Sequence, residues 1–72
     1  MDLLDYSDKG LTNIDNIMKQ DFTSKISLLL SKNKLERLFQ CSIDEAQRNY
    51  RTDLIVSIDL RDNPLADVTY TV

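Results

Sequence analysis

Leu54-Ile55-Val56-Ser57-Ile58-Asp59-Leu60 and, further on, Ala66-Asp67-Val68-Thr69-Tyr70-Thr71-Val72 are the stretches that decide the predicted fold. In each, apolar side chains occupy every second position, a period typical of a β-strand with one buried face. The connecting Arg61-Asp62-Asn63-Pro64-Leu65 suits a chain reversal, because proline fixes φ and lacks a donor while Asp and Asn side chains bond to nearby backbone. The sequence therefore predicts a C-terminal antiparallel β-hairpin.

An apolar stripe at helical spacing precedes this hairpin. Thr12 and Asp15 resemble a capping box, which predicts a helix start at Thr12. A start at Asp21 or Thr23 is the alternative, because this stretch is weakly helix-forming. Asn33 is expected to end the helix in the left-handed conformation. The stripe consists of apolar residues three and four positions apart: Ile14, Ile17, Met18, Phe22, Ile26, Leu29 and Leu30.

A second, shorter helix is predicted between the first helix and the hairpin. Ser42 and Glu45 form a capping box at its start. Residues 35–40 fit a helical turn or a short strand, and we favour a short extended segment. The predicted fold class is α+β, with two helices packed on the antiparallel hairpin and a third short strand around residues 35–40 as an option.

The domain organisation is simple. Residues 1–11 mix acidic and apolar side chains without a sustained period, and we interpret them as a flexible or docking N-terminal arm. Residues 12–72 are predicted to form a single small α+β domain. We find no internal repeat and no low-complexity segment.

Composition argues against several classes of function. The net charge is −3, with residues 1–24 at −3, residues 25–40 at +3 and residues 41–72 at −3. The acidic balance and the lack of interleaved aromatics argue against nucleic acid, and no apolar run approaches the roughly 20 residues of a membrane span. The acidic N-terminus does not resemble a signal peptide, so a cytoplasmic location is expected.

Catalytic and metal chemistry is not expected either. The chain has no histidine, and its single cysteine, Cys41, has no candidate base beside it. Asp59, Asp62 and Asp67 lack the ligand spacing of a dedicated calcium loop. We therefore predict no catalytic residue, no metal, no cofactor and no small-molecule substrate.

Binding of other proteins is the function that these exclusions leave. An exposed strand edge is a natural site for strand addition by another chain. We predict that the hairpin and the apolar residues of the arm bind the partner. The predicted partner-binding residues are Leu54, Val56, Ile58, Leu60, Val68, Tyr70, Val72, Leu3, Leu4 and Tyr6.

Three segments together resemble the baseplate-wedge family of contractile phage tails and related injection machines, a family once described as lysozyme-like. They are the apolar helix of residues 17–31, the segment Leu35-Glu36-Arg37-Leu38-Phe39-Gln40, which is similar to the family's Gly-Glu-Arg-x-Phe, and the corner Asn49-Tyr50-Arg51 before the hairpin. The family's Pro-x-Phe-Gly segment is absent here, and the corner lacks its Glu and Pro.

This resemblance implies a structural protein that joins neighbouring tail subunits through its hairpin, without catalysis. Such a protein would pass from the host cytoplasm into the virion. The alternative is a small acidic inhibitor or adaptor, encoded by a phage or its host, that binds another protein.

Overall fold

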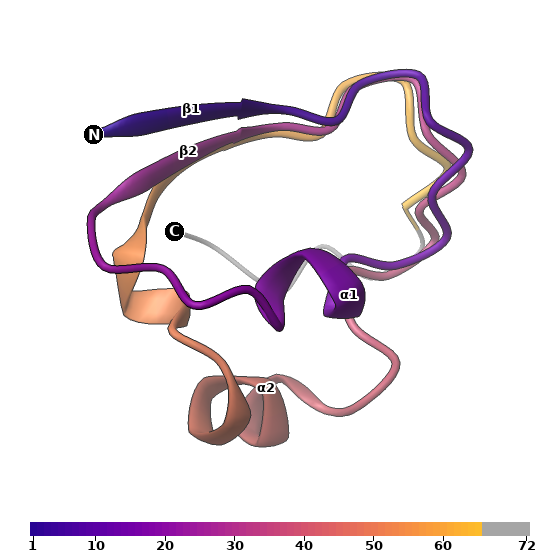
Figure 1. Ribbon diagram of the computed structural model, residues 1–72. Helices are drawn as coiled ribbons and strands as arrows, with labels where there is room; N and C mark the ends of the chain where they lie inside the picture. The colour runs from indigo at the N-terminus through magenta and orange to yellow at the C-terminus, as the bar shows by residue number, and fades with distance from the viewer. Residues whose placement is uncertain (66–72) are drawn as a thin grey trace.

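The computed structural model describes residues 1–65, which form a three-stranded parallel sheet covered on one side by short helices (Figure 1). The strands lie in the order β1 (Asp2–Asp5), β2 (Ile26–Leu29) and β3 (Ile55–Asp59). Both pairings, β1 with β2 and β2 with β3, are parallel. Parallel neighbours need a crossover connection between them, and here each crossover carries a short helix.

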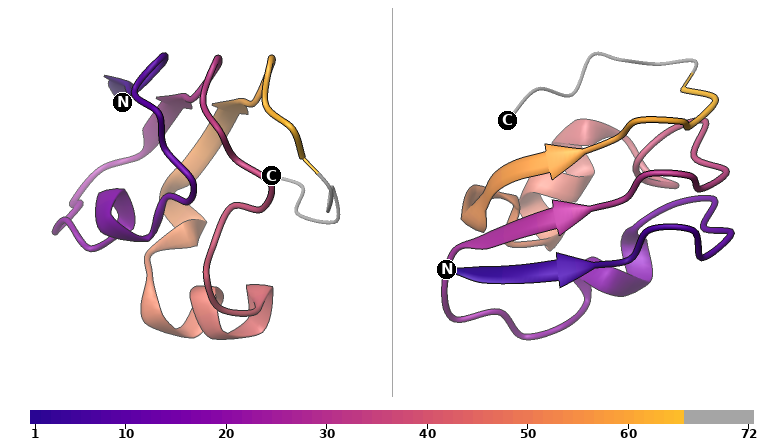
Figure 2. Two further views of the ribbon diagram at one scale, coloured as in Figure 1. Left: turned by 90° about the vertical axis from the view of Figure 1, so that its right-hand side faces the viewer. Right: turned by 90° about the horizontal axis from the view of Figure 1, so that it is seen from above.

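The helical segments all lie on one side of the sheet. They are α1 (Asp15–Met18), α2 (Ile43–Asn49) and the 3-10 helix η1 (Thr52–Leu54). After each strand the chain turns at the same end of the sheet, and the three turns lie side by side (Figures 1 and 2). The chain therefore winds as a coil, one strand per turn, and leaves the other side of the sheet without a covering element from residues 1–65.

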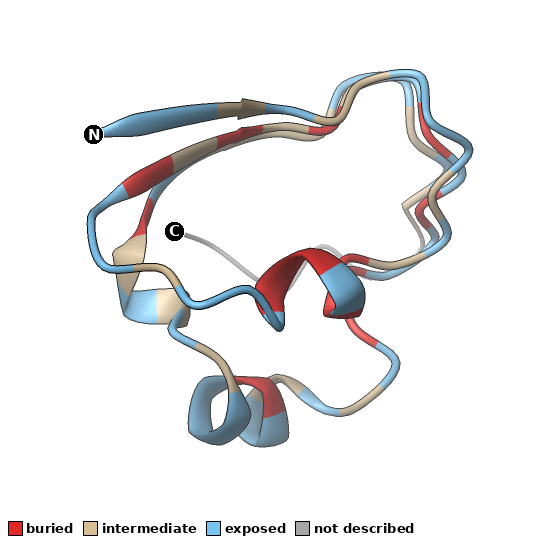
Figure 3. Cartoon of the chain, viewed as in Figure 1, coloured by how far each residue is buried: buried red, intermediate tan, exposed pale blue. Residues whose placement is uncertain are grey.

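The core fills the space between the sheet and the helical side (Figure 3). Leu28 and Leu30 point into it from β2 and the residue that follows, and both are fully buried. Phe39 stacks on Tyr50 with ring centroids 5.7 Å apart, which joins the loop after β2 to the end of α2. The buried apolar residues are Ile14, Ile17, Met18, Ile26, Leu28, Leu30, Leu35, Leu38, Phe39, Ala46 and Ile55.

The same local structure recurs along the chain at unequal intervals. Equivalent positions lie 24 and then 30 residues apart, as in the inward-facing strand residues Leu4, Leu28 and Ile58. Each strand is followed by one residue with positive φ at the same place in the turn. These residues are Asp8 (55°), Lys32 (59°) and Asp62 (60°). The expectation that the sequence has no internal repeat was wrong, because the unequal spacing hides a structural repeat.

The predicted antiparallel hairpin was also wrong. Its first strand exists as β3, but β3 pairs in parallel with β2 through Ser57 and Ser27. The expected second strand, residues 66–72, lies outside the described residues. A period of two shows that a segment is a strand with one buried face, and says nothing about the direction of its neighbour.

The first predicted helix is mostly a strand and loop. Only Asp15–Met18 is helical, and the N-cap is Ile14 without a side-chain cap bond, so neither Thr12 nor Asp21 starts a helix. Ile26 and Leu30 match a helical stripe, but with Leu28 they also match a strand, and the parallel pairing decides for the strand.

Four further expectations can be compared with the structure. The predicted helix start at Ser42 is confirmed, because the Ser42 hydroxyl accepts from the Glu45 amide at 3.2 Å. Residues 35–40 form bends, with neither a helix nor a strand, so the favoured short strand was wrong and the alternative helical turn is not found either. Asn33 does not adopt a positive φ, and the left-handed residue is its neighbour Lys32. Within the segment predicted as an arm, residues 2–5 form the edge strand β1.

Candidate binding face

The side of the sheet that points away from the helices is the candidate functional surface, and we call it the open face. Because side chains alternate along a strand, the neighbours of the inward-facing Leu4, Leu28 and Ile58 point outward. Cross-strand pairing aligns these outward residues in two rows. The rows are Leu3, Ser27 and Ser57, and then Asp5, Leu29 and Asp59. Ser7, Ser31 and Arg61 extend the open face just beyond the strands.

Apolar side chains on the open face are exposed to different extents. Leu3 is 66% exposed. Leu29 is half-buried and does not belong to the group of partly buried apolar residues that pack against the core. Val56, 39% exposed, is the extra residue where the register between β2 and β3 shifts. A bulge of this kind locally re-aims a strand, and here it leaves an apolar side chain outside the core.

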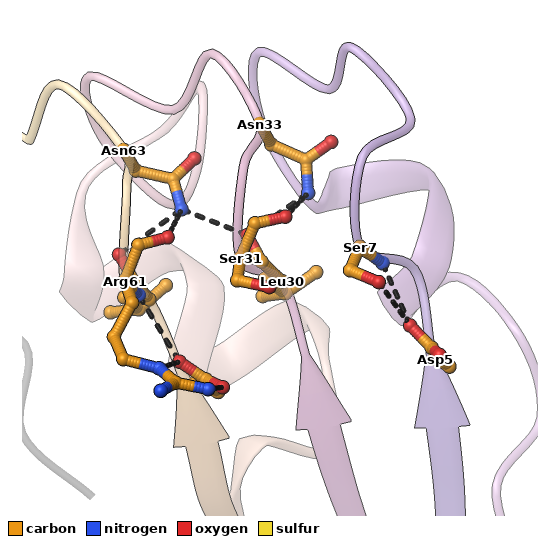
Figure 4. A network of polar contacts seen from close by, with 9 residues as sticks. Asp5, Ser7, Leu30, Ser31, Asn33, Arg61 and Asn63 are labelled. Atoms are coloured by element: carbon orange, nitrogen blue, oxygen red, sulfur yellow. Dashed lines mark hydrogen bonds and ion pairs between the residues drawn. The ribbon is translucent and has the colours of Figure 1, made fainter.

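Asp5 is a carboxylate held in place by local bonds. Its Oδ1 accepts from the backbone amide of Ser7 at 3.0 Å and from the Ser7 hydroxyl at 2.6 Å (Figure 4). The hydrogen bond from the Ser7 side chain lowers the pKa of Asp5, and the bond from the Ser7 amide lowers it further. Asp5 is therefore ionised at neutral pH.

Asp59 occupies the equivalent position on β3 and is paired with a cation. The Arg61 guanidinium contacts the two Asp59 oxygens at 2.8 and 3.0 Å, and the Arg61 amide donates to Oδ1 at 3.2 Å (Figure 4). The side-chain bond from Arg61 lowers the pKa of Asp59, and the same bond raises the pKa of Arg61. The β3 side of the open face is thus charge-balanced.

Two serines lie side by side in the middle of the open face. The Oγ atoms of Ser27 on β2 and Ser57 on β3 are hydrogen-bonded to each other. Cross-strand hydroxyl pairs of this kind support the alignment of neighbouring strands. The pair also keeps two small side chains at the centre of the open face, so nothing large stands between Leu3 and the β3 side.

Two asparagines fix the turns at the ends of the strands. Asn33 donates from Nδ2 to the carbonyls of Tyr6 and Leu30, both at 2.9 Å, and accepts at Oδ1 from the amides of Lys9 and Leu11 at 2.9 and 3.0 Å. Each of these bonds satisfies a backbone group, either in the turn that contains Asn33 or in the turn after β1. Asn33 is 6% exposed, so water cannot readily take over these hydrogen bonds if the side chain is removed.

Asn63 repeats this arrangement one turn later along the chain. Its Nδ2 donates to the Leu30 carbonyl at 2.8 Å (Figure 4) and to the Leu60 carbonyl at 3.1 Å. Its Oδ1 accepts from the Leu35 amide at 3.2 Å. Together the two asparagines hold the three turns at a fixed spacing. They thereby set the relative position of Asp5, Ser31 and Arg61 on the open face.

A second polar cluster lies on the helical side. Asp15 is 8% exposed and accepts from the Gln40 amide at 2.9 Å and from the Tyr50 hydroxyl at 3.0 Å. The bond to Asp15 raises the pKa of Tyr50. A depression of about 380 Å³ lies beside it, bordered by Met18, Lys19, Gln20, Asp21, Asn49, Tyr50 and Arg51. Both Asp15 carboxylate oxygens accept hydrogen bonds, and no buried side-chain nitrogen or oxygen of residues 1–65 lacks a partner, so Asp15 joins the loop of Gln40 to the end of α2.

The structure distributes the predicted partner-binding residues over both sides of the sheet. Leu3 and Val56 are exposed, whereas Leu4, Tyr6, Ile58 and Leu60 are half-buried and pack against the core. Leu54 is half-buried in η1. Val68, Tyr70 and Val72 lie outside the described residues. Of the described members, Leu3 lies on the open face and Val56 at its bulged margin.

Sequence reasoning missed most of the open face and both asparagines. A signal existed in the recurrence of apolar-x-apolar-x-x-Asn-x-apolar at Leu28 and Ile58, which places one Asn at the same distance after each strand. Within residues 1–65 no group of three or more metal-ligating side chains occurs. Nor does this part of the chain contain a helix of the length and apolarity that crossing a membrane requires.

Comparison of the chain with protein-family models, with curated proteins and with solved structures finds no match.

Proposed function

We propose that this chain is a protein-binding solenoid of the leucine-rich-repeat type, and that its partner binds the open face. The observation that carries the proposal is the asymmetry of the sheet. One face is packed against helices and the core, while the other presents Leu3, Leu29 and Val56 without a covering element from residues 1–65. Repeat proteins of this kind use an extended sheet surface for binding.

The spacing of the repeat supports the same class. Leucine-rich repeats follow the pattern L-x-x-L-x-L-x-x-N-x-L, with a strand and a short helix in each unit. The third unit matches it throughout as Ile55, Ile58, Leu60, Asn63 and Leu65. The second unit matches from Leu28 to Leu35 with Asn33, and the first has Met1, Leu4, Tyr6 and Leu11 with Lys9 at the Asn position.

The side chains of the open face are consistent with a protein as the partner. It presents exposed apolar side chains, Leu3 and Val56, beside one guanidinium and two carboxylates, and an apolar patch with a polar rim is the usual anatomy of a protein–protein interface. A role as a phage tail or baseplate subunit stays a prediction, and so does the alternative of an acidic inhibitor or adaptor. For both roles we expect the partner to contact the open face instead of the hairpin that the sequence predicted.

Replacement of Leu29 by Arg tests the proposal. Leu29→Arg places a long charged side chain at the centre of the open face, away from the core. Gln47→Arg is the matched control, because it adds the same charge to the exposed side of α2. Tagged chains are used to capture proteins from the lysate of the source cells. We expect the Leu29 variant to lose the captured protein and the Gln47 variant to keep it.

The same experiment separates the alternatives. Equal capture by both variants, with both chains folded by circular dichroism, would exclude binding through the open face. The identity of the captured protein then bears on the biological role. Tail components would support the assembly role, and a single stoichiometric host protein would support the inhibitor or adaptor.

A further inference from the structure

The charges on the open face are unevenly distributed between its two sides. Asp59, on the β3 side, is neutralised by Arg61 at 2.8 Å. On the β1 side Asp5 is bonded to Ser7, and no ion pair of residues 1–65 includes it. Both bonds from Ser7 end on Oδ1, and no described hydrogen bond uses Oδ2. A cation can therefore bind at Oδ2 without displacing Ser7.

Acidic residues outnumber basic ones in and just after β1. Asp2 and Asp8 lie in and just after the same strand, and both are exposed. Asp2 accepts one bond, from the Ser24 hydroxyl at 3.0 Å. Lys9 is the one basic residue among residues 1–11, and its attraction is the weakest of the influences on Asp5. Residues 1–11 therefore carry three acidic side chains against one basic side chain, a formal charge of −2, which favours a cationic partner group over an anionic one on this side.

Exposed apolar groups lie beside this carboxylate. Leu3, 66% exposed, is two residues before Asp5 on β1, and Leu29 is the direct neighbour of Asp5 on β2. We propose that the open face takes an extended segment of a partner protein, with a Lys or Arg side chain over Asp5 and an apolar side chain between Leu3 and Leu29. This inference rests on the proposed function and adds the chemistry of the partner.

Two other occupants fit the structure less well. A second copy pairing β1 with β1 would bring together two strands that each carry Asp2 and Asp5, and these like charges repel each other. Strand addition by a foreign chain at the outer edge of β1 would use the backbone and leave Leu29, one strand further in, without a contact. A segment lying across the open face uses the carboxylate and both leucines.

Two short synthetic peptides test the inference on the full-length, nitrogen-15-labelled chain. One repeats Arg-Leu-Ser, and the other has Glu in place of Arg. We expect the Arg peptide alone to shift the amide resonances of Leu3, Ser7 and Leu29. Binding should weaken about two- to fivefold in Asp5→Asn, the range of an exposed ion pair. It should also weaken with salt, because the screening length falls from about 10 Å at 0.1 M to about 3 Å at 1 M.

Glu36→Gln is the matched control, because Glu36 is exposed, lies outside the open face, and its replacement changes the net charge by the same amount. It should bind the Arg peptide as the unmodified chain does. Equal binding of the two peptides, or equal weakening by both variants, would overturn the inference. So would protection of the Leu3 and Asp5 amides from exchange without shifts at Leu29, which would indicate strand addition at the edge.

The failure of this inference is distinguishable from that of the proposed function. If neither peptide shifts the open face while Leu29→Arg still abolishes capture of the cellular partner, the partner lacks this basic chemistry. The open face would then be a binding surface for another kind of protein, and the inference would be wrong.

Discussion

Removal of the Asn33 side chain should destabilise the fold more than any other single polar substitution outside the core. Asn33→Ala removes four hydrogen bonds of 2.9 to 3.0 Å, three of which join the first two turns. At about 0.5–1.5 kcal/mol for each bond, the expected loss is about 2–6 kcal/mol. The upper half of that range applies, because the backbone groups left behind are part-buried. Domains of this kind have only about 5–15 kcal/mol of stability in total.

The assay is urea unfolding followed by far-ultraviolet circular dichroism. With a slope of about 1 kcal/mol per molar urea for a small protein, the midpoint of Asn33→Ala should fall by about 4–6 M or the chain should be unfolded in buffer. Asn16→Ala is the control, because Asn16 is exposed and surface changes stay within about 0.5 kcal/mol. Equal midpoints for the two variants would refute the role assigned to Asn33.

Three further predictions test other parts of the structure. Leu28→Ala should cost about 2–5 kcal/mol because Leu28 is fully buried, and Leu29→Ala should cost under about 1 kcal/mol. Equal losses in urea unfolding would contradict the assignment of their faces. Because the pKa of Tyr50 is raised, unfolding free energy should fall as pH rises above the ordinary value of about 10, and Tyr50→Phe should reduce that fall. Because the pKa of Asp5 is lowered, its share of stability should be lost as pH falls below about 3.9. Asp5→Asn should be less sensitive to acid, and an unchanged acid transition would argue against the Ser7 bonds.

Two elements of the local structure, β3 and α2, could be predicted from the sequence. The alternation at residues 54–60 predicted a strand, and β3 spans Ile55–Asp59. The capping box at Ser42 predicted the start of α2. These features depend on neighbouring residues along the chain, so local rules are sufficient to find them.

Pairing and topology could not be predicted in the same way. Ile26, Leu28 and Leu30 fit two periods at once, and only their parallel neighbours select the strand. The buried role of Asn33 depends on Tyr6, Lys9 and Leu11, more than twenty residues away. The resemblance of three segments to a baseplate family rested on local similarity, and it did not contain the information that decides which strands pair. The open face, which is defined by that pairing, was therefore largely missed.

The parallel register of the three strands is the central claim, because the repeat, the asparagine bonds and the open face all depend on it. The most direct test is a set of interstrand nuclear Overhauser effects in the isolated chain. We predict backbone contacts between residues 3 and 27 and between residues 27 and 57, in the pattern of parallel strands. An antiparallel ladder between residues 54–60 and 66–72, without contacts from residue 57 to residue 27, would contradict the account.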